Sequence, residues 1–152
     1  MAFSLRKALS SILKNKYSLI FKNQTWERCI DVLNEDGLAL RFIRNQEPEH
    51  CFAALMQNGL ALKYVKEQME DLCLVAVNQN GLALKYVKNQ THDICLLAVR
   101  QNGLALKYVN NQTPKLCLAA IRENNDAILY VKKEANSDIQ VVEVKNLLYY
   151  RK

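Results

Sequence analysis

Apolar and polar positions along the chain follow a pattern that repeats every 22 residues. Its clearest copies are the stretch NGLALKYVKNQT at 80–91 and the same stretch with one residue changed at 102–113. A fixed period of this length predicts a tandem array in which each unit packs against its neighbours. Glycine and cysteine keep the same interval, at Gly37, Gly59, Gly81 and Gly103 and at Cys29, Cys51, Cys73, Cys95 and Cys117.

Each unit is predicted to contain two short helices, as the unit at 91–112 illustrates. Thr91 is a suitable N-cap, and Asp93 in the first turn complements the positive end of the helix dipole. The next unit begins with Thr113-Pro114, which puts proline at the first helical position. We therefore expect the first helix of each unit to start four residues before its cysteine. Its apolar face consists of Ile94, Cys95, Ala98 and Val99.

The pair Asn102-Gly103 is expected to end this helix with a residue in the left-handed conformation. Asn125 stands in the glycine position of the fifth unit and is expected to adopt the same conformation. A second helix of about two turns follows, and helices this short need stacking to be stable in water. Its inward positions are predicted to be Leu104, Ala105, Tyr108 and Val109, with Lys107 and Asn110 on the opposite side.

The sequence thus predicts an all-α fold, an α-solenoid of short helix-turn-helix repeats with capping helices at both ends. Its expected parts are a basic amphipathic N-terminal cap at 1–24, five 22-residue repeats at 25–134 and a C-terminal cap helix at 135–152, in one continuous domain. Leucine-rich repeats have a similar period. Their pattern needs an asparagine three positions after the second leucine, whereas Asn89 and Asn111 come five after it, and the alanines and the Thr-Pro cap favour helices.

The N-terminal segment has apolar residues at helical spacing, with Arg6, Lys7 and Ser10 between them. A basic amphipathic helix suits a membrane-surface segment or an organelle transit peptide. We favour a third interpretation, a cap that covers the open apolar end of the stack. The apolar residues are Phe3, Leu5, Ala8, Leu9, Ile12 and Leu13.

The repeat NGLALKYVKNQTPxLCLAA resembles a tandem-repeat family of unknown function that is abundant in giant viruses infecting amoebae. Residues 25–134 carry the resemblance. The resemblance implies a helical repeat fold and a viral protein made in the cytoplasm of an amoeba. It implies no biochemical activity. The first unit departs most from the pattern, because Trp26, Arg28 and Asp31 stand where later units have small or apolar residues. This departure suits a boundary position.

Composition limits the compartment in which the chain is expected. No apolar run is long enough to span a membrane and no secretory signal is present, so we expect a soluble protein that is not secreted. The five cysteines follow the repeat, and helices packed ~8–10 Å apart are too distant for disulfides, which need Cα atoms within about 7 Å. We expect free, buried thiols in a reducing intracellular compartment, which is the host cytoplasm or a virus factory if the protein is viral.

Nothing in the sequence points to catalysis. His50 and His92 occupy different positions of the repeat and are expected to be exposed near helix starts. No phosphate-binding loop, nucleophile motif or metal-ligand spacing occurs. We therefore predict no enzyme, no cofactor and no metal site. One acidic residue per unit is interpreted as complementing the helix dipole rather than as a catalytic cluster, namely Glu27, Glu49, Asp71 and Asp93.

The net charge of +6 is unevenly distributed along the chain. Residues 1–26 hold five basic and no acidic residues, 27–71 hold five and nine, and 72–122 hold six and one. On its outward face, the first helix of the first unit carries Asp31. The equivalent positions of the middle units are apolar, and arginines flank them. We predict a protein-binding scaffold that takes a foreign partner or an antiparallel second copy on this strip, and no membrane binding. The candidate residues are Val75, Leu97, Arg100, Ala119 and Arg122.

The alternative is a nucleic-acid-binding protein. An aromatic row at 42, 64, 86, 108 and 130 runs beside a basic row at 41, 63, 85 and 107, which resembles in outline the surfaces that stack on RNA bases. Helical phase argues against this, because it turns the tyrosines into the core with their hydroxyls at the rim, about 100° from the lysines. The candidate polyanion-binding residues are Arg6, Lys7, Lys14, Lys85, Lys88, Lys107 and Arg122.

Overall fold

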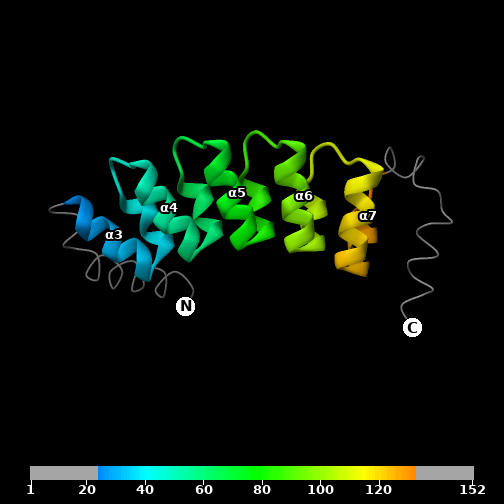
Figure 1. The fold of residues 1–152 in the computed structure, drawn as a ribbon, viewed down its shortest axis with the longest axis horizontal. Coiled ribbons are helices and arrows are strands. Elements are labelled where there is room, and N and C mark those ends of the chain that lie inside the picture. Colours follow the sequence, from blue (N-terminus) through cyan, green and yellow to red (C-terminus); the bar gives the residue numbers. More distant parts are fainter. Residues whose placement is uncertain (1–23, 133–152) are drawn as a thin grey trace, which may run out of the picture.

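The computed structural model describes residues 24–132, which form a curved row of stacked repeats (Figure 1). Each repeat pairs a ten-residue α-helix with a six-residue 3₁₀-helix. The α-helices pack side by side in one row, the 3₁₀-helices in a second, and no strand occurs among these residues. The elements are α3 (Trp26–Glu35), η1 (Gly37–Phe42), α4 (Pro48–Gln57), η2 (Gly59–Tyr64), α5 (Glu70–Gln79), η3 (Gly81–Tyr86), α6 (His92–Gln101), η4 (Gly103–Tyr108), α7 (Pro114–Glu123) and η5 (Asn125–Tyr130).

The predicted helical repeat solenoid with its 22-residue period is confirmed, while both predicted capping segments lie outside the described residues. Each α-helix begins as expected, with its N-cap four residues before the cysteine. The hydroxyls of Thr91 and Thr113 accept a backbone hydrogen bond from the first turn, and Pro114 opens α7. In α4 the side chains of Glu47 and His50 form a capping box. An acidic residue lies in the first turn of α3, α4, α5 and α6.

The second element of each repeat is a 3₁₀-helix and not the predicted two-turn α-helix. It starts on a local cap, because the side chain of Asn102 accepts the N–H of Leu104 at 3.0 Å. The same cap recurs in every repeat. Because a 3₁₀-helix has three residues per turn, the side chains that face inward are not the same ones as in an α-helix. Leu106 is fully buried although it was not predicted to face inward, whereas Leu104 and Tyr108 are only half-buried.

Glycine serves the packing of one repeat on the next rather than a turn. None of the described residues has a positive φ, so the left-handed conformation predicted at Gly103 and Asn125 is wrong. A Cβ atom on Gly81 would overlap the carbonyl oxygen of Ala98 in the following repeat. The N–H of Gly81 donates to Oε1 of Gln101 at 2.6 Å. The absent side chain therefore lets the next α-helix approach the backbone closely.

A ladder of glutamines joins each repeat to the next. Nε2 of Gln68 donates to the carbonyl of Leu62 in its own repeat at 3.4 Å and to that of Tyr86 in the next at 2.9 Å. Its Oε1 accepts the N–H of Lys88 at 3.0 Å and lies 3.8 Å from Sγ of Cys73. One side chain thus uses both of its donors and both of its acceptor sites. The ladder consists of Gln24, Gln46, Gln68, Gln90 and Gln112.

The core is one continuous row of small and aliphatic side chains between the two layers. All five cysteines are buried and free, as predicted. His92 is exposed as predicted, but the prediction for His50 is wrong, since only 4% of its surface is exposed. His50 occupies the position of the buried Leu72 and Ile94 of later repeats. Its Nδ1 accepts the N–H of Glu47 at 3.1 Å, which fits it into the start of α4.

The glutamine ladder gives a direct test of what holds the stack together. Gln68→Glu keeps the shape and the acceptor but removes the donors to Leu62 and Tyr86, and we expect the free energy of unfolding to fall by about 1–3 kcal/mol. Urea denaturation followed by circular dichroism measures this. Gln79→Glu is the matched control, because Glu123 occupies the equivalent position of the fifth repeat and the change removes only one long donor bond, to the carbonyl of Gln57 at 3.4 Å. Equal stability of the two variants would contradict the assigned role.

Candidate interaction surfaces

The stack has two long faces, one formed by the α-helices and one by the 3₁₀-helices with their links. Residues 24–132 contain twelve basic and twelve acidic side chains. The α-helices carry eight of the acids and four of the bases, whereas the 3₁₀-helices and links carry four acids and eight bases. This part of the chain is neutral in sum but polarised between its faces. Counting charges along the sequence did not reveal this polarity.

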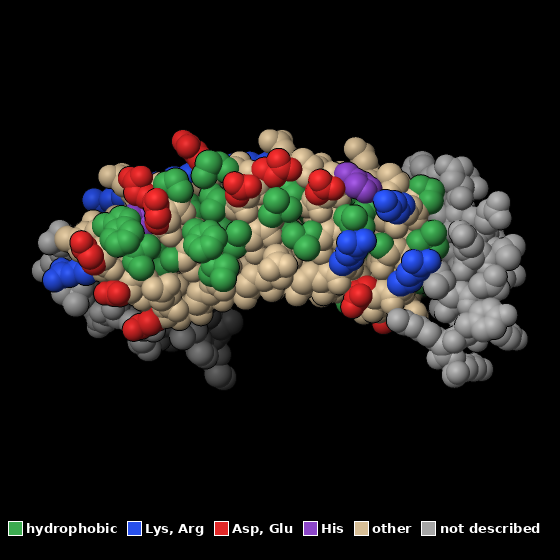
Figure 2. All heavy atoms as spheres, viewed as in Figure 1, with side chains coloured by type: hydrophobic (Ala, Val, Ile, Leu, Met, Phe, Trp, Pro, Cys, Tyr) green, Lys and Arg blue, Asp and Glu red, His purple; other side chains and the backbone are tan. Residues whose placement is uncertain are grey.

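Large apolar side chains are exposed on the α-helical face of the first three repeats. The exposed fraction is 50% for Trp26, Phe52 and Met69 and 58% for Met56, and Met69 is the N-cap residue directly before α5. Figure 2 shows hydrophobic side chains along this face, with acidic side chains gathered over α3 to α5 and basic ones mainly at the α6 and α7 end. Sequence reasoning missed these residues because each belongs to one repeat only. The sequence did contain one signal. Phe52 and Met56 are four residues apart, so they share one face of α4, and that face is not the one that carries the buried residues.

The predicted partner-binding residues lie on this same face. Val75, Leu97 and Ala119 are half-buried and pack against the core, while Arg100 and Arg122 are exposed. The apolar strip therefore continues the core outward, and the fully accessible apolar surface lies nearer to α4 than the sequence suggested.

The other face carries a basic residue beside an aromatic ring in each of four repeats. Tyr64, Tyr86 and Tyr108, predicted as core, are only half-buried, and Tyr130, predicted likewise, is exposed. The distances from the cationic group to the ring centroid are 4.5 Å for Arg41 and Phe42, 4.6 Å for Lys63 and Tyr64, 5.7 Å for Lys85 and Tyr86, and 4.9 Å for Lys107 and Tyr108. Lys85 and Lys107 also lie 6.0 and 5.8 Å from the ring of the following repeat. The predicted aromatic and basic rows therefore form one mixed ladder.

The candidate polyanion-binding residues do not all come together. Lys85, Lys88 and Lys107 share the 3₁₀ face, but Arg122 lies on the α-helical face. Lys88 also donates from Nζ to the carbonyl of Lys66 in the preceding repeat at 3.2 Å. Three further candidates, Arg6, Lys7 and Lys14, lie outside the described residues.

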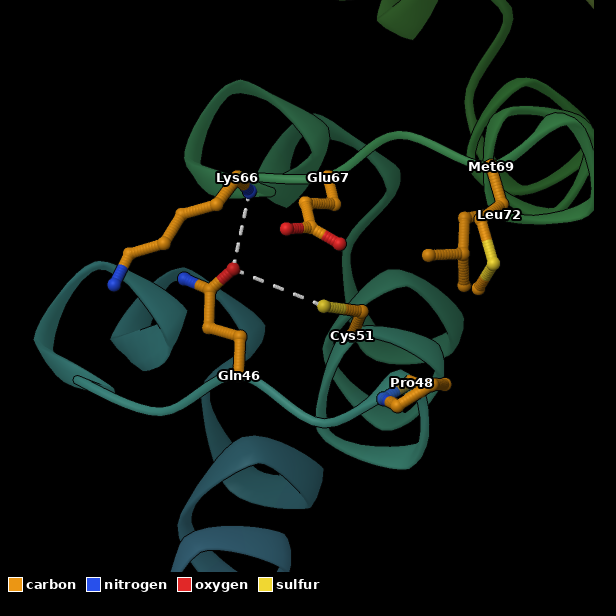
Figure 3. A pocket seen from close by; sticks show the side chains of 7 residues that line it. All are labelled: Gln46, Pro48, Cys51, Lys66, Glu67, Met69 and Leu72. Carbon is orange, nitrogen blue, oxygen red and sulfur yellow. Dashed lines mark hydrogen bonds between the residues drawn. The ribbon is translucent and has the colours of Figure 1, made fainter.

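Shallow hollows lie between successive repeats, near the starts of the α-helices. The four that lie between α3 and α7 have volumes of about 240 to 290 Å³. In the one drawn in Figure 3, Oε1 of Gln46 accepts the N–H of Lys66 at 3.1 Å and lies 3.8 Å from Sγ of Cys51. Since equivalent residues line each hollow, we interpret them as grooves left by the stacking of repeats. The lining residues in Figure 3 are Gln46, Pro48, Cys51, Lys66, Glu67, Met69 and Leu72.

The cysteine thiols that line the hollows are not activated. Burial raises the pKa of all five thiols above the ordinary value of cysteine. A protonated thiol is a weak nucleophile and a weak metal ligand. Within residues 24–132, no group of three or more histidines, cysteines and acids could hold a metal ion. His50 leaves its Nε2 buried without a hydrogen-bond partner in the described structure, 6.3 Å from Trp26 between ring centroids.

By its fold, the protein is a helical repeat solenoid. Residues 70–113 match the family model of a domain of unknown function (DUF4116), a stretch that covers two successive repeats. This match fits the resemblance to a repeat family of unknown function, while the link to giant viruses stays a prediction. No curated protein and no solved structure matches the chain. None of the described helices has the length and apolar character that crossing a membrane requires.

The buried thiols yield a prediction that separates structural from reactive cysteines. With the pKa raised by burial, we expect all five thiols to react with a chromogenic disulfide reagent at least tenfold more slowly in the native protein than in denaturant, at neutral pH. Absorbance against time measures the rate, and a small free thiol serves as the reference. One thiol that reacts as fast as the reference in native protein would contradict a purely structural role.

Proposed function

We propose that the protein is a non-enzymatic scaffold that binds another protein through its α-helical face. The observation that carries the proposal is the exposed apolar group of Trp26, Phe52, Met56 and Met69, beside the half-buried strip that ends at Arg122. Apolar surface rimmed by charges is typical of protein-binding sites. The five free thiols support a reducing compartment as its setting. The resemblance to repeats of amoebal giant viruses would make that compartment the cytoplasm of an infected host.

The partner favoured by charge is a second copy of the chain. Acids dominate α3 to α5, including Asp31, whereas Arg100, Lys115 and Arg122 lie on α6 and α7. A twofold axis that passes beside α5, parallel to this face and perpendicular to the row of helices, sets α3 of one copy over α7 of the other and α4 over α6. Such a pair is closed and self-complementary. It also places the exposed Phe52 and Met56 over the apolar strip of α6 and removes them from water.

Removal of the exposed apolar side chains tests the surface. We expect the double variant Phe52→Ser and Met56→Ser to lose self-association by tenfold or more, because these side chains are central in the proposed contact. Light scattering at micromolar concentrations measures the mass. Leu129→Ser is the control, because Leu129 is 77% exposed but belongs to η5, in the other layer. Leu97→Asp is less suitable because Leu97 packs against the core.

Charge exchange tests the twofold arrangement separately. Asp31→Lys and Arg122→Glu each put like charges at both contacts of a homodimer, so we expect each variant alone to be monomeric. Mixed in equal amounts, they restore two opposite-charge contacts and should form a heterodimer that weakens as salt is added. Two variants that stay monomeric when mixed would rule out this arrangement. If the unaltered protein is itself monomeric, the partner is a foreign protein, to be captured with the unaltered face and lost with Phe52→Ser and Met56→Ser.

A further inference from the structure

The basic residues of the 3₁₀ face form a single row of equivalent cations. Arg41, Lys63, Lys85 and Lys107 occupy the same position of four successive repeats, one at the last turn of each 3₁₀-helix. All four are exposed. Within residues 24–132 their contacts are with aromatic rings, and none forms an ion pair with a carboxylate. The row is therefore a positive surface that no carboxylate among residues 24–132 neutralises.

The aromatic rings hold these cations in place. Cation–π contacts fix the ammonium group near the ring centroid, and Lys85 and Lys107 lie between the rings of two successive repeats. Side chains that are already ordered lose less conformational entropy when a ligand binds. Because one side of each ammonium group faces a ring, its remaining N–H donors are available to a ligand on the solvent side.

The pKa of the Tyr64 hydroxyl responds to the positive charges of this row. Burial alone would raise the pKa of its hydroxyl, but hydrogen bonding and charge from Lys63 and Arg41 lower the pKa below its ordinary value. Two cations from neighbouring repeats thus act on one hydroxyl. At Tyr64, the cations of two successive repeats therefore lie close enough to act on the same group.

We propose that this row binds the phosphate backbone of a nucleic acid without reading its bases. Repeats packed at the usual ~8–10 Å carry one cation each, a spacing wider than that of successive phosphates, so a strand would meet the row at some of its phosphates only. The row repeats one chemical group, so it has nothing with which to distinguish one base from another. The rings are half-buried and carry the cations, so bases do not stack on them. The site lies on the face opposite the proposed protein-binding surface.

Fluorescence anisotropy with the full chain tests the site against a labelled single-stranded RNA of about 20 nucleotides, between about 50 and 200 mM salt. Neutralising four phosphates of a single strand predicts a slope of log K against log salt of about −3. The triple variant Lys63→Gln, Lys85→Gln and Lys107→Gln should flatten this slope by about 2 and weaken binding at low salt by tenfold or more.

The matched control removes the same charge from the other face, by Arg100→Gln, Lys115→Gln and Arg122→Gln. It should leave the slope unchanged, whereas an equal effect of both triple variants would overturn the proposal. Absence of binding at low salt, or an affinity that depends on base sequence, would overturn it as well. Replacing the three lysines by arginine should preserve binding, which separates loss of charge from loss of fold. Circular dichroism confirms that each variant is folded, and self-association by the α-helical face is read in the same samples by light scattering.

Discussion

The structure depends on one hydrogen-bonding arrangement, the glutamine that links each repeat to its successor. Gln90 donates to the carbonyls of Leu84 and Tyr108, and its Oε1 accepts the N–H of Asn110 at 2.9 Å. The segments that it joins have no regular hydrogen-bonding partner of their own, since each 3₁₀-helix ends at its tyrosine and the next α-helix has not begun. The carbonyls of Leu84 and Tyr108 are partly buried, and leaving a partly buried backbone group unpaired costs stability. The ladder therefore allows helices as short as ten and six residues to form an extended fold.

This arrangement fixes some positions of the repeat and frees others. Gly81 must lack a side chain because a carbonyl of the next repeat approaches it, and Ala98 must stay small because it supplies that carbonyl from the helix interface. Neither constraint reaches the outer side of the α-helices, where the equivalent residues are Met56, Asn78 and Arg100 in successive repeats. A solenoid of this kind can vary its outer side without altering its stacking energy. The outer side of the α-helices can therefore differ from one repeat to the next while the stacking stays the same.

Sequence reasoning recovered the architecture because period, capping and cysteine spacing are local signals. It identified Thr91 as an N-cap and Cys95 as a buried free thiol, and both are confirmed. It failed at the second helix, because the Asn-Gly pair is typical of helix ends with positive φ and gives no sign that Asn102 instead caps a 3₁₀-helix. The change from 3.6 to 3.0 residues per turn then shifted the inward face and left Tyr108 half-buried. The roles of Gln90 and Gly81 depend on atoms of the neighbouring repeat, which no reading of a single unit reveals.

The two faces differ in a way that relates to the ligands they suit. On the 3₁₀ face, Lys63, Lys85 and Lys107 are the same residue at the same position, so this row is uniform over three successive repeats. A uniform surface fits a uniform polymer, since every register of the ligand offers the same contacts. On the α-helical face, charge and apolar exposure change from repeat to repeat, so that only one register aligns acids with bases. Variation of this kind specifies a single partner and a single orientation. Under the two proposals, one stack holds a nonspecific ligand and a specific partner on opposite sides, since the side chains that form the glutamine ladder belong to neither binding surface.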